Sequence, residues 1–131
     1  MVIPCLRYRD PAAAVDWLCR AFGFGKQLVA EHDGAVVHAQ LTFANGMIML
    51  GPVGDSAYNR HMVQPDEVGG RNTQSVYVVV PDADAHHAQA VAAGAVVTLP
   101  LEDADYGGRG YSCRDPEGHF WSFGTYDPWA S

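Results

Sequence analysis

The sequence is short of lysine and cysteine, and it has no long apolar run. Lys26 is its only lysine, and the formal net charge is -7, from 8 basic and 15 acidic residues. Because contacts with phosphates need a basic footprint, this balance disfavours nucleic-acid binding. A membrane-spanning helix needs about 18 or more successive apolar residues. The sequence contains no such run, so we expect no membrane partner either.

The cysteines are few, odd in number and far apart, at Cys5, Cys19 and Cys113. This spacing argues against a disulfide framework and against a CxxC redox or metal motif. The N-terminus also lacks the basic segment and apolar stretch of a secretory signal peptide. Together these features predict a protein of the reducing cytoplasm.

What remains is the composition of an ordinary globular protein. The chain has 131 residues, of which 48% are hydrophobic and 18% charged. This length predicts a single domain, 1–131, that is able to bury a sizeable core. The acidic excess favours solubility, and it would also help to attract a cationic ligand.

A hairpin pattern occurs twice in the sequence. Each copy has a strand, a tight turn rich in Gly or Pro, and a return strand. The strands are Val36–Phe43 and Met47–Leu50 around Asn45-Gly46, then Tyr111–Arg114 and Phe120–Phe123 around Asp115-Pro116-Glu117-Gly118. A unit that is repeated in this way is strong evidence about the fold.

The segments before the two hairpins are also alike. Asp10-Pro11 and Asp82 are N-terminal caps, and Gly23 and Gly94 end helices of nearly equal length. We expect the buried helix faces to be formed by Val15, Leu18, Cys19 and Phe22 in the first helix, and by Ala88, Val91 and Ala92 in the second. Further strands are expected at Val2–Tyr8, Lys26–Glu31, Val76–Val80 and Val96–Leu99.

The sequence therefore predicts an α+β protein built from two β-α-β-β-β modules. Module one covers 1–51, a linker covers 52–74, module two covers 75–126, and a C-terminal tail covers 127–131. The linker is rich in Gly, Pro, Asp and Asn. A loop of this length either crosses the molecule or covers a site.

The helix opening from Arg7 to Gly23 and the closing motif RDPEGHFWSF, Arg114 to Phe123, resemble the vicinal oxygen chelate superfamily. This is the glyoxalase, bleomycin-resistance and extradiol-dioxygenase group, and the motif is most similar to its bleomycin-resistance-like or uncharacterised glyoxalase-like branch. The resemblance implies mixed sheets that curl around a cleft. It also implies a homodimer with clefts at or near the subunit interface.

Metal-dependent members of this superfamily take two ligands from each module. Aligned on the helix-ending glycines and the closing turn, those positions are Ile3, Met49, Ser75 and Ser122. None is a usual ligand for a divalent metal. A shift of one residue offers only Gln74, so we expect no metal and no cofactor.

Strand alternation, combined with the resemblance, predicts which side chains face the cleft. The apolar walls are expected to be Met47, Met49, Tyr77, Tyr111 and Phe120, with Tyr111 and Cys113 on the same inward face. The polar points are expected to be Arg7, His38, Gln40 and Ser122. In the strand Val36–Phe43, the set Val37, Ala39, Leu41 and Phe43 is expected beneath the helix. A mostly apolar cleft with a few polar groups is typical of small-molecule sites.

Each polar candidate has an ordinary structural explanation as well. Arg7 binds an anionic group or forms a salt bridge, and it lies where some glutathione-using relatives place a substrate-binding arginine. His38 is the best acid–base candidate or is merely hydrogen-bonded. The other histidines, including His86 and His87, are expected at the surface. Cys5 and Cys113 are expected to be small buried hydrophobes rather than nucleophiles.

Three functions stay open at this point. The first is metal-free binding of a small aromatic, possibly cationic or amphipathic molecule, for sequestration or resistance. The second is a metal-independent isomerase, lyase or cyclase in which His38 acts as acid or base and Arg7 holds a carboxylate. The third is a metal-dependent lyase or dioxygenase with atypical ligands.

Overall fold

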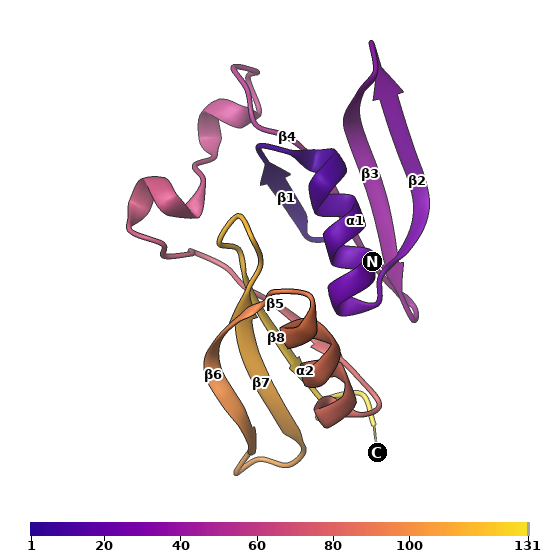
Figure 1. Cartoon of the computed structure of the whole chain (residues 1–131), viewed down its shortest axis with the longest axis vertical. Helices are drawn as coiled ribbons and strands as arrows, with labels where there is room; N and C mark the ends of the chain where they lie inside the picture. The colour runs from indigo at the N-terminus through magenta and orange to yellow at the C-terminus, as the bar shows by residue number, and fades with distance from the viewer. Residues whose placement is uncertain (131) are drawn as a thin grey trace. The chain divides into compact units, whose positions relative to one another are not determined.

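The computed structural model describes residues 1–130, and the chain divides into two compact units, Met1–Arg71 and Asn72–Ser131. Each unit is a four-stranded mixed sheet with one α-helix, which confirms the α+β class and the repeated β-α-β-β-β module (Figure 1). The boundary between the units falls inside the expected linker. The expected tail 127–131 ends on Ser131, which lies outside the described residues.

In unit 1 the strands lie in the order β1-β4-β3-β2. Strand β1 is parallel to β4, and the other neighbours are antiparallel. The elements are β1 Cys5–Tyr8, α1 Pro11–Phe22, β2 Gly25–His32, β3 Ala35–Phe43 and β4 Gly46–Pro52. Two short 3₁₀ helices follow, at Asn59–His61 and Pro65–Val68, in the segment that the sequence presented as a linker.

Unit 2 repeats this topology as β5-β8-β7-β6, with β5 parallel to β8. Its elements are β5 Val76–Val79, α2 Ala83–Ala92, β6 Val96–Asp103, β7 Arg109–Arg114 and β8 Phe120–Gly124. Strands β6 and β7 are longer than predicted. Within residues 1–130, no helix is both long enough and apolar enough to cross a membrane.

Helix α1 follows its sequence signals closely. The Asp10 side chain accepts a hydrogen bond from the Ala13 N–H at 3.0 Å, Pro11 occupies the first turn, and Gly23 ends the helix at φ 87°. Val15, Leu18 and Phe22 are buried as expected, whereas Cys19 is only half-buried. Figure 1 shows α1 lying across one face of the β1-β4-β3-β2 sheet, so that face holds the core of unit 1.

The predicted buried face of α2 is wrong. Ala83, His86 and Ala90 are the buried residues, while Val91 is 46% exposed and both Ala88 and Ala92 are exposed. The His86 ring stacks on Phe123, with centroids 4.2 Å apart, and so fills the place of an apolar core residue. A histidine has a flat, largely apolar body, but a rule that sorts residues by polarity assigns it to the surface.

Two further orientations differ from prediction. Tyr111 and Cys113 lie on the helix-covered face, paired across the sheet with the buried residues Phe123 and Trp121. In β3 the buried residue is Val36 rather than Val37, which is 42% exposed. The cause is a β-bulge in β3 itself: the consecutive β2 residues Ala30 and Glu31 pair with His38 and Val36, so Val37 is an extra residue and the start of β3 leaves strict alternation.

The closing turn of unit 2 is built around the buried carboxylate of Asp115. One oxygen accepts hydrogen bonds from the backbone N–H groups of Glu117 and His119 at 3.0 and 3.1 Å. The other accepts from the Trp121 indole N–H at 3.0 Å. The first residues after the unit boundary attach to the same turn, because Asn72 donates to the Gly118 carbonyl and accepts from the Phe120 N–H.

Candidate functional site

Each sheet has one face covered by its α-helix and an opposite face that this α-helix does not cover, which we call the open face. In β1, Leu6 and Tyr8 are buried on the covered face, whereas Cys5 is exposed and Arg7 half-buried on the open one. Cys5 was expected to be buried, so that prediction is wrong. Strand alternation places the predicted site residues His38, Gln40 and Met49 on the open face as well.

Arg7 lies flat against the open face of unit 1 because its neighbour on β4 has no side chain. Arg7 pairs with Gly51, and a Cβ atom added at Gly51 would come within 2.7 Å of the Arg7 Nη1 atom. On its other side the guanidinium faces the Tyr58 ring, with Cζ 4.9 Å from the ring centroid. The glycine and the tyrosine therefore hold the charged group of Arg7 between them.

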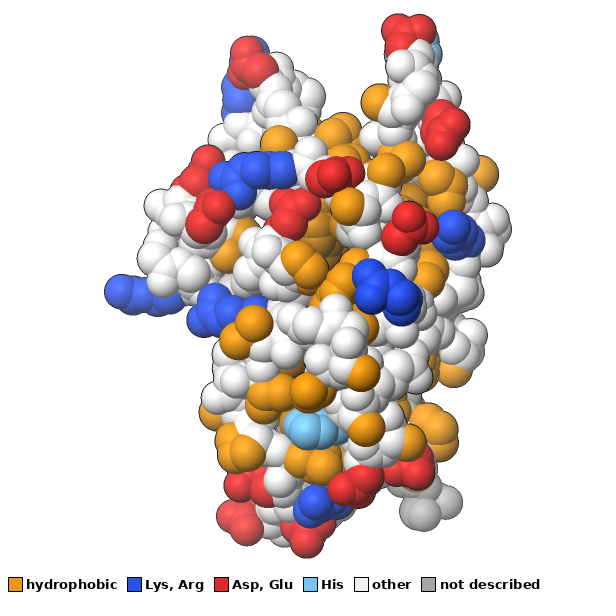
Figure 2. Space-filling model, viewed as in Figure 1, with side chains coloured by type: hydrophobic (Ala, Val, Ile, Leu, Met, Phe, Trp, Pro, Cys, Tyr) orange, Lys and Arg blue, Asp and Glu red, His pale blue; other side chains and the backbone are white. Residues whose placement is uncertain are grey.

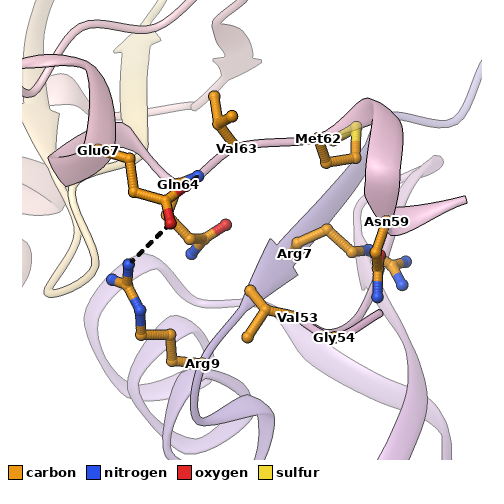
Figure 3. A pocket seen from close by; sticks show the side chains of 9 residues that line it. All are labelled: Arg7, Arg9, Val53, Gly54, Asn59, Met62, Val63, Gln64 and Glu67. Atoms are coloured by element: carbon orange, nitrogen blue, oxygen red, sulfur yellow. Dashed lines mark hydrogen bonds and ion pairs between the residues drawn. The ribbon is translucent and has the colours of Figure 1, made fainter. Parts of the chain in front are cut away.

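Arg7 also lines a cavity of about 270 Å³ within unit 1. Figure 3 shows the Arg7 side chain reaching toward Asn59, while Arg9 and Glu67 face each other on another side of the cavity. Met62, Val63 and Gln64 complete much of its wall. The residues between Val53 and Glu67, which the sequence presented as a linker, thus form one side of this cavity.

The linker is fastened to the rest of unit 1 by polar contacts. Arg9 donates to both carboxylate oxygens of Asp66 at 2.6 and 2.8 Å, and this bonding lowers the pKa of Asp66. The Glu67 side chain accepts from the Gln64 N–H at 2.9 Å in a capping box. The sequence carries one signal for this order, since Gln64-Pro65 followed by Glu67 is a helix-start pattern.

A chain of hydrogen bonds crosses the open face of unit 1. Gln40 Nε2 donates to Gln27 Oε1 at 2.6 Å, so Gln40 Oε1 is left to accept from His38 Nε2 at 2.9 Å. This direction puts a proton on His38 Nε2. Gln27, which sequence reasoning missed, is the extra residue of a bulge in β2, between Lys26 and Leu28.

Unit 2 has a larger cavity, of about 590 Å³, on its open face. Its floor is a row of four residues across the sheet, in which Tyr77 pairs with Ser122, Ser122 with Ser112, and Ser112 with Leu99. The two serine hydroxyls are 2.7 Å apart and hydrogen-bonded. Tyr77 and Ser122 were both predicted, whereas Ser112 was missed because Tyr111 and Cys113 were assigned to this face.

Tyr77 is fixed at one side of this cavity. Its ring lies over Gly124, where an added Cβ would meet the Tyr77 hydroxyl oxygen at 2.7 Å. The hydroxyl donates to the Tyr126 carbonyl oxygen at 2.7 Å. Desolvation, which is the largest influence, raises the pKa of Tyr77, so the hydroxyl remains a neutral donor near neutral pH.

The remaining predicted residues are placed differently. Tyr111 borders the cavity of unit 2, but its ring is buried and its hydroxyl lies 2.6 Å from His86 Nδ1 on α2. Phe120 is half-buried and pairs with Arg114 of the neighbouring strand β7. In unit 1, Met49 of β4 pairs with Cys5 of β1 on one side and with Gln40 of β3 on the other. Neither Phe120 nor Met49 lines one of these two cavities.

The residues at the superfamily's metal positions do not fit a divalent ion. Of the four residues, Ile3 has no donor in its side chain, Met49 offers a thioether, Ser75 offers a neutral hydroxyl, and Ser122 already shares its hydroxyl with Ser112. Divalent ions of this group of proteins need imidazole, carboxylate or amide donors that converge. Within residues 1–130, no three His, Cys, Asp or Glu side chains gather in a way that would hold a metal.

Comparison with known families and structures agrees with this fold and its repeat. The family model of the Glyoxalase/Bleomycin resistance protein/Dioxygenase superfamily matches residues 2–123. The chain belongs to this superfamily. An uncharacterised protein of Mycobacterium bovis is 33% identical over 124 residues, which are 92% of this chain and 80% of that protein.

Solved structures give the same result. The crystal structure of TioX from Micromonospora sp. ML1 is 36% identical, covers 100% of this chain and 99% of TioX, and has a TM-score of 0.76. The bleomycin-binding protein from Streptomyces verticillus, solved with copper(II)-bleomycin, is 20% identical and has a TM-score of 0.63, with 96% and 95% of the two chains covered. The second likeness shows the shared fold.

Proposed function

We propose that this protein binds a small aromatic or amphipathic molecule on an open sheet face, without a metal, and so sequesters it. The observation that carries this proposal is the cavity of unit 2. Its floor places Tyr77 and Leu99 on either side of the hydrogen-bonded pair Ser112–Ser122, and Ser122 stands where the resemblance aligns a metal ligand of metal-dependent relatives. Apolar walls with a few oriented hydroxyl groups favour binding by shape and stacking.

The known relatives are consistent with this proposal. The bleomycin-binding protein of Streptomyces verticillus was solved in complex with copper(II)-bleomycin, so a protein of the same fold is able to bind such a molecule. We further propose that the protein is a cytoplasmic homodimer, as sequence and resemblance predict. Met49 and Phe120, which line neither cavity described above, then remain candidate contacts for the ligand.

The acid–base alternative depends on His38, and its surroundings support it less well. The one side-chain hydrogen bond of His38 within residues 1–130 is to the neutral amide of Gln40. A general base is usually oriented by a carboxylate or comparable group that stabilises the charged ring. The arrangement fixes the ring in position, but it supplies no charge to favour proton transfer, so binding is the better-supported function.

The proposal is tested by titrating the protein with Nile red, a neutral fluorescent dye, before and after dialysis against EDTA. We expect saturable binding with the same Kd in both cases. Leu99→Ser removes an apolar side chain that is 55% exposed and lines the cavity, and it should weaken binding about tenfold, because full burial of a leucine side chain contributes roughly 1.5–3 kcal/mol and a bound ligand would bury the exposed part of this one. Val91→Ser is the matched control, since Val91 is an exposed apolar residue on α2.

Two outcomes would contradict the proposal. One is dye binding that EDTA abolishes and added metal restores, which would place a metal in the site. The other is the absence of saturable binding, or equal weakening by Leu99→Ser and Val91→Ser. Circular dichroism of each variant would establish that it is folded before its Kd is compared.

A further inference from the structure

The cavity of unit 2 is flanked by tyrosine rings that are open to a ligand. Tyr77 lines one side and Tyr106, which is 71% exposed, lines another. Tyr106 also meets Tyr126 edge to face, with centroids 5.1 Å apart, and Tyr77 donates to the Tyr126 carbonyl oxygen. Tyr126 does not line the cavity itself, but it contacts both tyrosines that do, and the faces of the Tyr77 and Tyr106 rings carry partial negative charge.

The charged groups that line this cavity are all acidic. Glu102, Asp103 and Asp105 lie where β6 leads into β7, and no basic side chain lines the cavity in the part of the chain that the structure describes. Figure 2 shows acidic side chains gathered at this end of the molecule, with a basic side chain among them. In unit 2, Arg109 forms ion pairs with Asp84 at 3.1 Å and with Asp103 at 3.4 Å.

Arg109 does not neutralise the other two carboxylates. Within residues 1–130, Glu102 and Asp105 make no side-chain hydrogen bond and no ion pair. Both are exposed, and both border the same space as the Tyr77 and Tyr106 rings. Open aromatic faces beside uncompensated carboxylates attract a positive charge through two effects of the same sign.

The smaller cavity of unit 1 has a different character. It is lined by Arg7, Arg9 and Glu67, and Arg9 is paired with Asp66 and Glu67. A lining whose charged groups are all acidic is therefore a feature of the unit 2 cavity that the unit 1 cavity does not share.

We infer that the cavity of unit 2 selects a ligand whose aromatic body carries a cationic nitrogen, such as a quaternary or protonated amine. The aromatic part would lie over the row Tyr77–Ser122–Ser112–Leu99, and the cation would lie between the tyrosine rings and the carboxylates of Glu102 and Asp105. This inference rests on the proposed function and adds the charge of the ligand to it. No covalent step is involved.

Three compounds with one aromatic body test this inference: (1-naphthylmethyl)trimethylammonium, 1-naphthalenemethanol and 1-naphthalenesulfonate. Their affinities are measured by displacement of Nile red and checked by equilibrium dialysis. We expect the cation to bind at least about tenfold more tightly than the neutral alcohol at low salt, and the anion to bind most weakly. The cation's advantage should shrink at high salt, because salt screens exposed charges.

The double variant Glu102→Gln, Asp105→Asn should remove most of the cation's advantage and leave the affinity for 1-naphthalenemethanol unchanged. Asp33→Asn is the matched control, since Asp33 is an exposed acidic residue on the β2–β3 turn of unit 1. This variant should change neither the cation's advantage nor the affinity for 1-naphthalenemethanol. Tyr106→Leu should lower the affinity for the cation more than the affinity for the neutral alcohol. Tyr106→Phe keeps the aromatic ring and should keep the preference for the cation.

The outcomes separate this inference from the proposed function. Saturable binding of 1-naphthalenemethanol with no preference for the cation would overturn the charge selectivity and leave metal-free binding in place. A preference for the cation that persists in the double variant would overturn the assignment to Glu102 and Asp105. Failure of all three compounds to displace bound Nile red would overturn the charge selectivity alone, whereas absence of saturable binding of Nile red itself would overturn the proposed function as well.

Discussion

Replacing Asp115 by alanine is expected to lower the free energy of unfolding by about 4 kcal/mol. Asp115 is 3% exposed, and its carboxylate accepts from the Trp121 indole and from the Glu117 and His119 N–H groups. Hydrogen bonds to charged groups contribute roughly 1.5–3 kcal/mol each, and stranded buried donors add a desolvation cost. Urea unfolding followed by tryptophan fluorescence would give the value.

Two further variants make this prediction specific. Asp115→Asn keeps one acceptor oxygen but turns an NH₂ group toward another donor, so we expect an intermediate loss. Asp16→Ala removes a carboxylate that is 76% exposed and 3.6 Å from Lys26, and it should cost less than about 1 kcal/mol. A loss below about 1 kcal/mol for Asp115→Ala would show that the closing turn does not depend on this carboxylate.

The second large effect is a loss of stability in alkali. Burial, followed by the nearby Asp115 charge, raises the pKa of Cys113 from 9.0 to about 12. Burial, followed by Cys113, likewise raises the pKa of Tyr111. The native state then keeps protons that the unfolded state releases, so the free energy of unfolding is unaffected below about pH 9 and falls as the pH rises toward 12.

Urea unfolding at several pH values from 8 to 11 would measure this loss. Cys113→Val should make the alkaline fall shallower, because one of the retained protons is removed. Cys5→Val should leave it unchanged, since Cys5 is exposed. In the native protein, Cys113 should react with Ellman's reagent at least ~100-fold more slowly than Cys5. Equal reactivity of the two thiols, or the same pH profile in both variants, would contradict the account.

Local sequence signals predicted most of the fold because each has a direct physical cause. Asp10, Pro11 and Gly23 fix the two ends of α1 through a side-chain cap, a preset φ angle and a left-handed residue. Turn residues fixed both hairpins in the same way. The repeat then supplied the topology, because two copies of one unit fold by the same rules.

The wrong predictions concern features that neither the two-residue period of a strand nor the 3.6-residue period of a helix reveals. A bulge in β3 at Val37 buried Val36 in place of Val37, and the contacts of His86 with Tyr111 and Phe123 placed a polar residue in the core of unit 2. Alternation alone cannot say which face of an isolated hairpin lies under a helix. For that reason Tyr111 was assigned to the open face in place of Ser112.

The candidate site was predicted in part. Arg7, Tyr77 and Ser122 line the two cavities as expected from strand alternation. The sequence did not reveal that Gly51 makes room for the Arg7 guanidinium or that Tyr58 covers it, because both contacts join residues far apart in the chain. Glu102, Asp105 and Tyr106 were missed because β6 is longer than its apolar part and carries its acidic end to the cavity.

Metal content is the most direct test of the central proposal, which is ligand binding without a metal. The measurement is elemental analysis of the purified protein, together with thermal unfolding in the presence of Ni²⁺, Zn²⁺, Fe²⁺ and Mn²⁺. The account predicts far less than one metal per chain and no rise of the unfolding midpoint with metal concentration. A stoichiometric metal, or a midpoint that rises with metal concentration as mass action requires, would contradict it.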